Sequence, residues 1–440
     1  MARTRKSSNL GADIRGDTSA PAMSTMNETN PIDSEPPKWD TAPQSTTDKT
    51  SKSHSKRRRS RSCIRRFKDT CLKHTWLLPF LIMAVLLLAY AVNPTTSNPM
   101  HSAIFLSYPQ PPKTPGGPVM YGKGPKDIAF CCFYTVVLSF TREFLMQRMI
   151  HPLAVYCGIR GKGKTARFME QVYTAVYFAI FGPYGLYVMS RTNIWYFNTT
   201  AMFEGFPHRE HEGLFKAYYL LQASYWAQQA IVLLLQLEKP RKDFRELVGH
   251  HIITLALIAL SYRFHFTYLG LAVYITHDVS DFFLATSKTL NYIDAYITAP
   301  YFGFFVFVWI YLRHILNLKF LWAVLTEFRT VGPFELNWET QQYKCWISQY
   351  ITFALLASLQ AVNAFWLFLI LRILKNYLFT NIKRDERSED EDEEEEEVDQ
   401  GATSTATQAT STGAASLTAR SVNTEKKTPQ VMINGQPVKR

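Results

Sequence analysis

Eight segments of this chain, each about 20 residues long, are rich in large apolar side chains and poor in charge. A helix of about 20 residues spans the ~30 Å hydrocarbon core of a bilayer. The apolar runs are continuous and do not alternate with polar residues, which argues against a transmembrane β-barrel. We therefore predict an all-α polytopic membrane protein with about eight transmembrane helices. They cover roughly residues 76–92, 128–146, 171–190, 217–237, 249–262, 268–286, 298–320 and 347–371.

Polar tails flank the apolar part of the chain. Residues 1–75 are basic and rich in Ser, Thr and Pro, and this composition buries too little apolar surface to fold. Residues 383–440 contain nine consecutive acids and then a Ser-, Thr- and Ala-rich stretch, and like charges at this density keep a chain open. We expect both tails to be disordered. The basic cluster at residues 56–68 is typical of the positive-inside anchor of a first span, so we expect no nucleic-acid partner.

The distribution of Lys and Arg predicts the orientation of the spans. Basic residues gather between the second and third spans and between the fourth and fifth, and positive loops face the cytosol. An even number of spans then places both termini in the cytosol. In this topology Asn198, in an Asn-Thr-Thr sequon, faces the lumen and is a candidate glycosylation site. Ser388, directly before the acidic run, is a candidate phosphorylation site.

The span at 249–262 carries a polar face. His250 and Thr254 are four residues apart and therefore share one face of a helix, with His251 next to it. An ionisable side chain at membrane depth costs about 3 kcal/mol to insert, so it persists where it faces a protein interior or a wet cavity.

The following span, 268–286, carries a second polar stripe. Helix periodicity places His277, Asp281 and Lys288 on one face and Asp278 beside it. The connection between the two spans is short, so they should be antiparallel neighbours whose imidazoles face the carboxylates. A single buried His or Asp would be explained by a hydrogen bond to a neighbouring helix. Several ionisable side chains on two successive spans indicate a functional site.

Three kinds of protein could use such a group of side chains. Two His and two Asp suit a metal, but membrane di-iron enzymes need many more histidines, so we expect no metal. A proton-coupled transporter would scatter ionisable groups over several spans and show an internal repeat, and this sequence has neither. A His that is oriented by an Asp acts as a base or a nucleophile at neutral pH, which suits an enzyme.

The stretches His250-His-Ile-Ile-Thr254, His277-Asp-Val-Ser-Asp281 and Lys288-Thr-Leu-Asn-Tyr292 closely resemble the signature of the ceramide synthases, the longevity-assurance family. The resemblance extends over a TLC-type catalytic domain, expected at residues 164–382 with six spans. Residues 76–163 then hold the first two spans and a lumenal loop. The tails are similar to those of the fungal branch. The alternative is a non-enzymatic TLC protein acting in lipid sensing or membrane protein insertion, although such proteins generally lack the full set of His and Asp.

The resemblance implies a sphingosine N-acyltransferase that joins a fatty acyl chain from acyl-CoA to a sphingoid base, giving dihydroceramide or phytoceramide in the endoplasmic reticulum membrane. By motif match, His250 and His251 correspond to the essential His pair of the family, and Asp278 and Asp281 to its essential Asp pair. The family also implies no bound cofactor, a homodimer or a complex with a small accessory subunit, and chain-length selectivity set partly by the loop at 321–346.

Two routes remain open for the transfer. In the direct route, one His removes a proton from the sphingoid amine while the other, or Thr254, stabilises the thioester oxyanion. In the covalent route, His250 attacks the thioester first and forms an acyl-imidazole. Basic residues beside the His pair are candidates to bind the phosphates of CoA, although positive-inside anchoring explains them equally well: Lys239, Arg241, Lys242 and Arg245.

Overall fold

The computed structural model describes residues 65–112, 115–235, 243–380, 432–433 and 436–437. All of them belong to the second of two units into which the chain divides, residues 65–440. Residues 1–64 and the acidic run with Ser388 lie outside the described residues. So do Lys239, Arg241 and Lys242, which were three of the four candidates for binding CoA phosphates.

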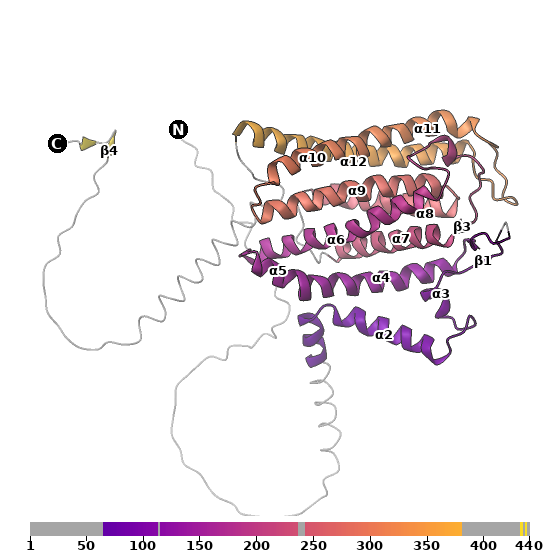
Figure 1. The fold of residues 1–440 in the computed structure, drawn as a ribbon, viewed down its shortest axis with the longest axis horizontal. Coiled ribbons are helices and arrows are strands. Elements are labelled where there is room, and N and C mark those ends of the chain that lie inside the picture. Colours follow the sequence, from indigo (N-terminus) through magenta and orange to yellow (C-terminus); the bar gives the residue numbers. More distant parts are fainter. Residues whose placement is uncertain (1–64, 113–114, 236–242, 381–431, 434–435, 438–440) are drawn as a thin grey trace, which may run out of the picture. The chain divides into compact units, whose positions relative to one another are not determined.

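Each of the eight predicted segments forms a helix (Figure 1). A helix satisfies its own backbone hydrogen bonds, which a spanning segment requires in lipid. The helices are α2 (Leu77–Val92), α4 (Lys126–Leu145), α6 (Lys162–Ser190), α7 (Gly213–Leu234), α8 (Phe244–Arg263), α9 (Thr267–Tyr292), α10 (Thr298–Ile310) and α12 (Trp346–Thr380). Two π-helical segments extend this set: η1 (Met146–Ile150) leads from α4 into α5 (His151–Tyr156), and η3 (Tyr311–Leu316) leads from α10 into α11 (Asn317–Thr330).

Short elements occupy the connections. They are α3 (His101–Ile104), the 3₁₀-helix η2 (Thr200–Met202) and the strands β1 (Pro109–Gln110), β2 (Met120–Tyr121) and β3 (His211–Glu212). These strands form an antiparallel sheet in the order β1-β2-β3, which ties the α6–α7 connection to the segment before α4. Strands β4 (Met432–Ile433) and β5 (Gln436–Pro437) pair with each other.

Within the described residues, five helices are long and apolar enough to cross a membrane, or six if the bent pair Arg65–Lys73 and Leu77–Val92 counts as one span. The five are Lys126–Tyr156, Lys162–Ser190, Phe244–Arg263, Thr298–Thr330 and Trp346–Phe379. Helices α7 and α9 are not among them, and both bury polar side chains inside the bundle. The protein is therefore a multi-pass membrane protein, as predicted, while the number of eight spans stays a prediction.

Helix α9 has neighbours on several sides. It packs against α6, α8, α10 and η3, and α12 covers α8, η3 and α10 (Figure 1). On the other side, α7 lies between α4 and α8. A close approach of α6 to α7 depends on Gly185, because a Cβ there would lie 2.5 Å from Oη of Tyr218.

The short turn between α8 and α9 makes these helices antiparallel neighbours, as predicted. His265 in this turn has a φ of 68°, the left-handed conformation that reverses the chain. Two other connections pack on the turn, since Phe206 stacks on Phe266 and Tyr343 stacks on His265. We call this end of the bundle the connection end.

Candidate active site

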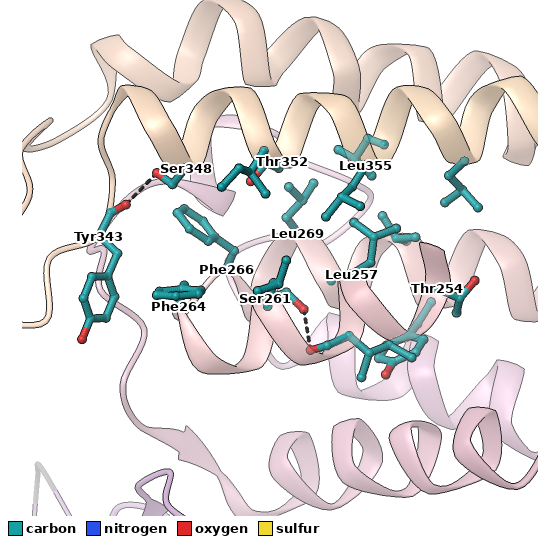
Figure 2. A pocket seen from close by; sticks show the side chains of 18 of the residues that line it. Thr254, Leu257, Ser261, Phe264, Phe266, Leu269, Tyr343, Ser348, Thr352 and Leu355 are labelled. Carbon is teal, nitrogen blue, oxygen red and sulfur yellow. Dashed lines mark hydrogen bonds between the residues drawn. The ribbon is translucent and has the colours of Figure 1, made fainter. Parts of the chain in front are cut away.

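A cavity of about 240 Å³ lies between α8, α9 and α12. Figure 2 shows Leu257 and Ser261 of α8 on one side of it and Thr352 and Leu355 of α12 on the other. Tyr343 lies at the connection end of the cavity (Figure 2). The walls are mostly apolar, and they include Ile258, Leu260, Leu269, Val273, Ile347, Ile351, Leu356 and Leu359.

Three of the predicted site residues line this cavity: His250, Thr254 and His277. All three lie in the part of the cavity far from the connection end, because they come from the first half of α8 and the middle of α9. The other predicted residues do not line it. They are His251, Asp278, Asp281 and Lys288.

His250 is 4% exposed and lies between two indole rings. The ring of Trp226 on α7 meets it edge-on at 5.7 Å between centroids, and the ring of Trp366 on α12 does so at 5.1 Å. Its Nε2 is 3.4 Å from Oγ1 of Thr254, the residue one turn along α8. Its Nδ1 has no hydrogen-bond partner among the described residues. The fold therefore leaves one buried nitrogen of His250 without a hydrogen-bond partner.

His277 has a partner for each ring nitrogen. Its Nδ1 is 2.8 Å from the carbonyl oxygen of Val273, which can only accept, so Nδ1 carries the proton. Its Nε2 then accepts a hydrogen bond from the amide of Asn363 on α12, at 3.3 Å. These two contacts determine the tautomer and the orientation of the ring.

His251 is half-buried beside the cavity. Its Nδ1 is 2.9 Å from the carbonyl oxygen of Leu247. Its ring meets the rings of His250 and Trp226 edge-on, at 5.7 and 5.9 Å between centroids. The two imidazoles are thus adjacent, and it is His250 that lines the cavity.

The prediction that the carboxylates face the imidazoles is wrong for Asp278. This side chain is fully buried and points to α7, where it accepts hydrogen bonds from Oη of Tyr218, at 2.8 Å, and from the amide of Gln222. Consecutive residues of a helix differ in direction by about 100°, so Asp278 faces another helix than His277 does.

The prediction is also wrong for Asp281, which pairs with Arg313 of η3 at 2.5 Å. Arg313 is 1% exposed and donates three more hydrogen bonds. They go to Oγ of Ser280 at 2.6 Å, Oδ1 of Asn363 at 3.2 Å and the carbonyl oxygen of His277 at 3.3 Å. A buried carboxylate needs a charged, hydrogen-bonded partner, and a guanidinium supplies more donors than an imidazole does.

Comparisons with known proteins identify the family of this chain. A family model described as a TLC domain matches residues 167–372. The chain is 52% identical to sphingosine N-acyltransferase lac1 of Schizosaccharomyces pombe, over 76% of this chain and 87% of that protein. It is 50% identical to ceramide synthase LAG1 of Saccharomyces cerevisiae, over 73% of this chain and 78% of that protein.

The chain belongs to the ceramide synthase family. A third relative is sphingosine N-acyltransferase-like protein FUM17 of Gibberella moniliformis, with 52% identity over 77% of this chain and 88% of that protein. The resemblance to the fungal ceramide synthases that the His and Asp motifs indicated is thereby confirmed.

In this member of the ceramide synthase family, two buried residues at the site were missed by the sequence analysis. Arg313 is a charged residue within an apolar span, and such a residue by itself indicates a functional site. It lies in the π-helix η3, a kind of segment that often occurs at functional sites. Asn363 is fully buried on α12 and joins Arg313 to His277. It gave no signal in the sequence, since one amide in an apolar span is common.

The remaining candidates lie outside the cavity. Arg245, in the first turn of α8, is exposed and lies five residues from His250. Lys288 is half-buried near the end of α9. Asn198 is exposed, while the following Thr199 and Thr200 bond to the carboxylate of Glu327 at 2.9 and 3.0 Å. Within the described residues, no three His, Cys, Asp or Glu side chains form a group that could hold a metal ion.

Proposed function

We propose that the protein is a sphingosine N-acyltransferase, a ceramide synthase that transfers a fatty acyl group from acyl-CoA to the amine of a sphingoid base. Relatives that are 52% and 50% identical to it, over 76% and 73% of the chain, carry these names. The observation that carries the proposal is the position of His250 and His277 at one end of a mostly apolar cavity. An imidazole exchanges protons near neutral pH, and the apolar walls suit a hydrocarbon chain.

The acyl chain lies in the cavity with its thioester at the imidazoles. The lining residues extend from His250 of α8 to Phe264, directly after this helix, a length of about 21 Å at 1.5 Å per residue. An extended hydrocarbon with C–C bonds of about 1.5 Å advances roughly 1.3 Å per carbon. The cavity therefore accommodates a long-chain acyl group. At its far end lie Leu336, Trp338 and Tyr343, within the loop that the family resemblance associates with chain-length selectivity.

The imidazoles accept and pass on the proton that the sphingoid amine loses in the reaction. The sphingoid amine is mostly protonated at neutral pH and attacks only after it has lost a proton. His250 has the ring nitrogen without a partner, so it is the base in the direct route and the nucleophile in the covalent route. Thr254 bonds to the other nitrogen of His250 and orients the ring.

The carboxylates act on the site through other side chains. Asp281 forms an ion pair with Arg313, and Arg313 donates a hydrogen bond to Asn363, which contacts Nε2 of His277. Asp278 holds α7 against α9 through Tyr218. Both are therefore positioning residues, in contrast to the direct contact with imidazole that the sequence indicated.

The substrates and partners follow from this function. Acyl-CoA is a co-substrate and no cofactor is bound. The CoA nucleotide stays outside the cavity on the cytosolic side, near Arg245. Both termini are cytosolic, the membrane is that of the endoplasmic reticulum, and the protein forms a homodimer or binds a small accessory subunit.

An acyl-transfer assay tests the proposal. The protein is produced in cells that lack endogenous ceramide synthases and is purified in detergent. It is then supplied with a sphingoid base and a series of acyl-CoAs of increasing chain length. Formation of ceramide that depends on His250 supports the proposal. Binding of the lipids without product formation would favour a lipid-sensing TLC protein instead.

A further inference from the structure

Three residues that line the cavity each have a buried polar atom without a hydrogen-bond partner among the described residues: Nδ1 of His250, Oη of Tyr274 and Nε1 of Trp226. Buried polar groups without a partner are rare in proteins, and each one needs an explanation. A hydroxyl or an imidazole can donate or accept, but an indole N–H can only donate. The missing partner of Trp226 must therefore be an acceptor.

Trp226 lies at the imidazole end of the cavity. It is 8% exposed, and its ring meets the rings of His250 and His251 edge-on, at 5.7 and 5.9 Å between centroids. Tyr274 lies one turn from His277 towards the connection end, where its ring packs against Tyr219 at 5.1 Å between centroids. Of the two unpartnered groups outside the imidazoles, Trp226 is the one beside the reacting end of an acyl chain.

The second indole next to His250 offers an internal comparison. Nε1 of Trp366 donates to Oδ2 of Asp243 at 3.2 Å, so its N–H is satisfied within the fold. Nε1 of Trp76 and of Trp309 also lack partners, but neither residue lines the cavity. Among the tryptophans that the structure describes, Trp226 combines a buried, unpartnered N–H with a place in the cavity wall.

We propose that the indole N–H of Trp226 donates a hydrogen bond to the thioester carbonyl oxygen and stabilises the oxyanion that forms there. This inference rests on the proposed acyl transfer. Donors aimed at developing negative charge in a site without water stabilise the transition state strongly. Thr254, the donor that the sequence indicated, is engaged with Nε2 of His250.

The role of Trp226 is the same in both routes. In the direct route an imidazole takes one proton from the ammonium and passes it to the solvent, and the neutral amine nitrogen bonds to the thioester carbon while the carbonyl π electrons move to the oxygen. The imidazole then takes the second proton from this nitrogen. Collapse of the intermediate re-forms the carbonyl and breaks the C–S bond, and the CoA thiolate takes that proton from the imidazolium. In the covalent route an imidazole nitrogen displaces the thiolate first and the amine then displaces the imidazole. Each step passes through an oxyanion.

An isosteric replacement tests the proposal. We would replace Trp226 by β-(3-benzothienyl)alanine, which keeps the two rings and has sulfur in place of N–H, and also make Trp226→Phe. Loss of one oxyanion donor should lower kcat about 100- to 1000-fold. The KM values for acyl-CoA and for the sphingoid base should change much less. The same replacement at Trp366, whose N–H bonds to Asp243, is the matched control, and its effect on kcat should be at least tenfold smaller, roughly in line with a lost neutral hydrogen bond.

The outcomes separate this inference from the proposed function. A benzothienylalanine variant at position 226 with the kcat of the unmodified enzyme would overturn the proposal, because only the shape of the ring would then matter. A higher KM at unchanged kcat would overturn it too, because the N–H would then bind the ground state and the transition state equally. Gel filtration in detergent checks that each variant is folded. If the unmodified protein makes no ceramide in the same assay, the proposed function itself fails.

Discussion

Asn363 of α12 donates a hydrogen bond to Nε2 of His277 on α9, at 3.3 Å. The amide oxygen of Asn363 accepts from Arg313, and Arg313 is paired with Asp281. His277 and Asp281 are one turn apart on α9, yet two side chains from other helices connect them. The carboxylate therefore acts on the imidazole through Arg313 and Asn363, and this connection depends on the packing of α9, η3 and α12 together.

Asn363→Leu should lower kcat about tenfold or more, because His277 loses the partner that orients its ring in proton transfer. The pH profile of kcat/KM should shift as well, because Nε2 of His277 loses the hydrogen bond from Asn363. Gln360→Leu is the matched control: Gln360 lies one turn earlier on α12 and bonds to Nδ1 of His314 at 2.7 Å. Steady-state kinetics at several pH values measures both effects. If both variants lost kcat equally, the effect of Asn363→Leu would reflect lost stability of α12 and not the contact with His277.

Asp281→Leu should destabilise the protein by about 3–5 kcal/mol, because it leaves the buried guanidinium of Arg313 without its charged partner. Arg313→Leu should destabilise it less, because the carboxylate of Asp281 is only half-buried. The double variant should recover much of this stability, since no unpaired charge remains. It should not recover activity, because Asn363 and His277 are still without the guanidinium. Thermal unfolding in detergent together with the acyl-transfer assay measures the two properties. A double variant as active as the native protein would refute the positioning role.

His250→Ala should insert into the membrane normally and lose at least about 100-fold in kcat, since it removes the ring that acts as base or nucleophile. His151→Ala, at an exposed histidine of α5, is the control. Mass spectrometry after incubation with acyl-CoA alone distinguishes the two routes. An acyl adduct on His250 supports the covalent route, and its absence favours direct attack. Full activity of the His250 variant would contradict both.

Tyr343→Ala should shift the products towards longer acyl chains, because it opens the connection end of the cavity. Tyr343 is 4% exposed there and packs against Phe264 and His265. Trp346→Ala is the matched control, since Trp346 is an exposed aromatic residue three positions away that does not line the cavity. Competition among acyl-CoAs of different length, with the products analysed by mass spectrometry, measures the shift. An unchanged chain-length profile would mean that the acyl chain does not reach Tyr343.

The stability of the connection end should decrease at acidic pH. Burial, together with the charges of Lys123 and Lys344, lowers the pKa of His208 from its ordinary value near 6.5 to about 4, although the hydrogen bond to the carbonyl oxygen of Met202 opposes this shift. The unfolded chain then binds a proton between about pH 6.5 and 4 that the folded protein does not bind, so stability falls as the pH falls through this range. The full effect is roughly 3 kcal/mol. Burial lowers the pKa of His265 as well, to about 3, which adds to the same trend.

His208→Phe tests this pH dependence. Phe keeps an aromatic ring against Tyr268, which His208 contacts at 4.0 Å between centroids, but it does not titrate. Unfolding temperatures measured from pH 7 to pH 4 should therefore fall less steeply for the variant than for the native protein. If the unfolding temperatures of the two proteins fell equally with pH, His208 would not contribute to the pH dependence of stability.

The helices could be predicted from the sequence because a spanning segment must be apolar and must satisfy its own backbone. The polar faces of α8 and α9 could be predicted too, since helix periodicity alone brings His250 and Thr254 together. Periodicity does not say which neighbouring helix a face meets. Asp278 was therefore expected beside an imidazole, but it bonds to Tyr218, 60 positions away in the sequence.

The network around His277 could not be predicted for the same reason. Its members come from three helices, and Arg313 and Asn363 are separated from His277 by 36 and 86 residues. Arg313 could have been found as a charged residue in an apolar span. Trp226 could not, because a tryptophan in a membrane helix is common and only its unpartnered N–H in the cavity wall distinguishes it.

In the proposed complex the acyl chain occupies the cavity between α8, α9 and α12 with its thioester at His250. A thioether analogue of acyl-CoA, which cannot transfer its chain, can carry a diazirine at the end of that chain. After illumination, peptide mapping shows which residues the chain end touched. We expect labelling of Leu336, Trp338 or Tyr343 at the connection end. Labelling confined to lipid-facing residues of α2 or α11 would contradict it.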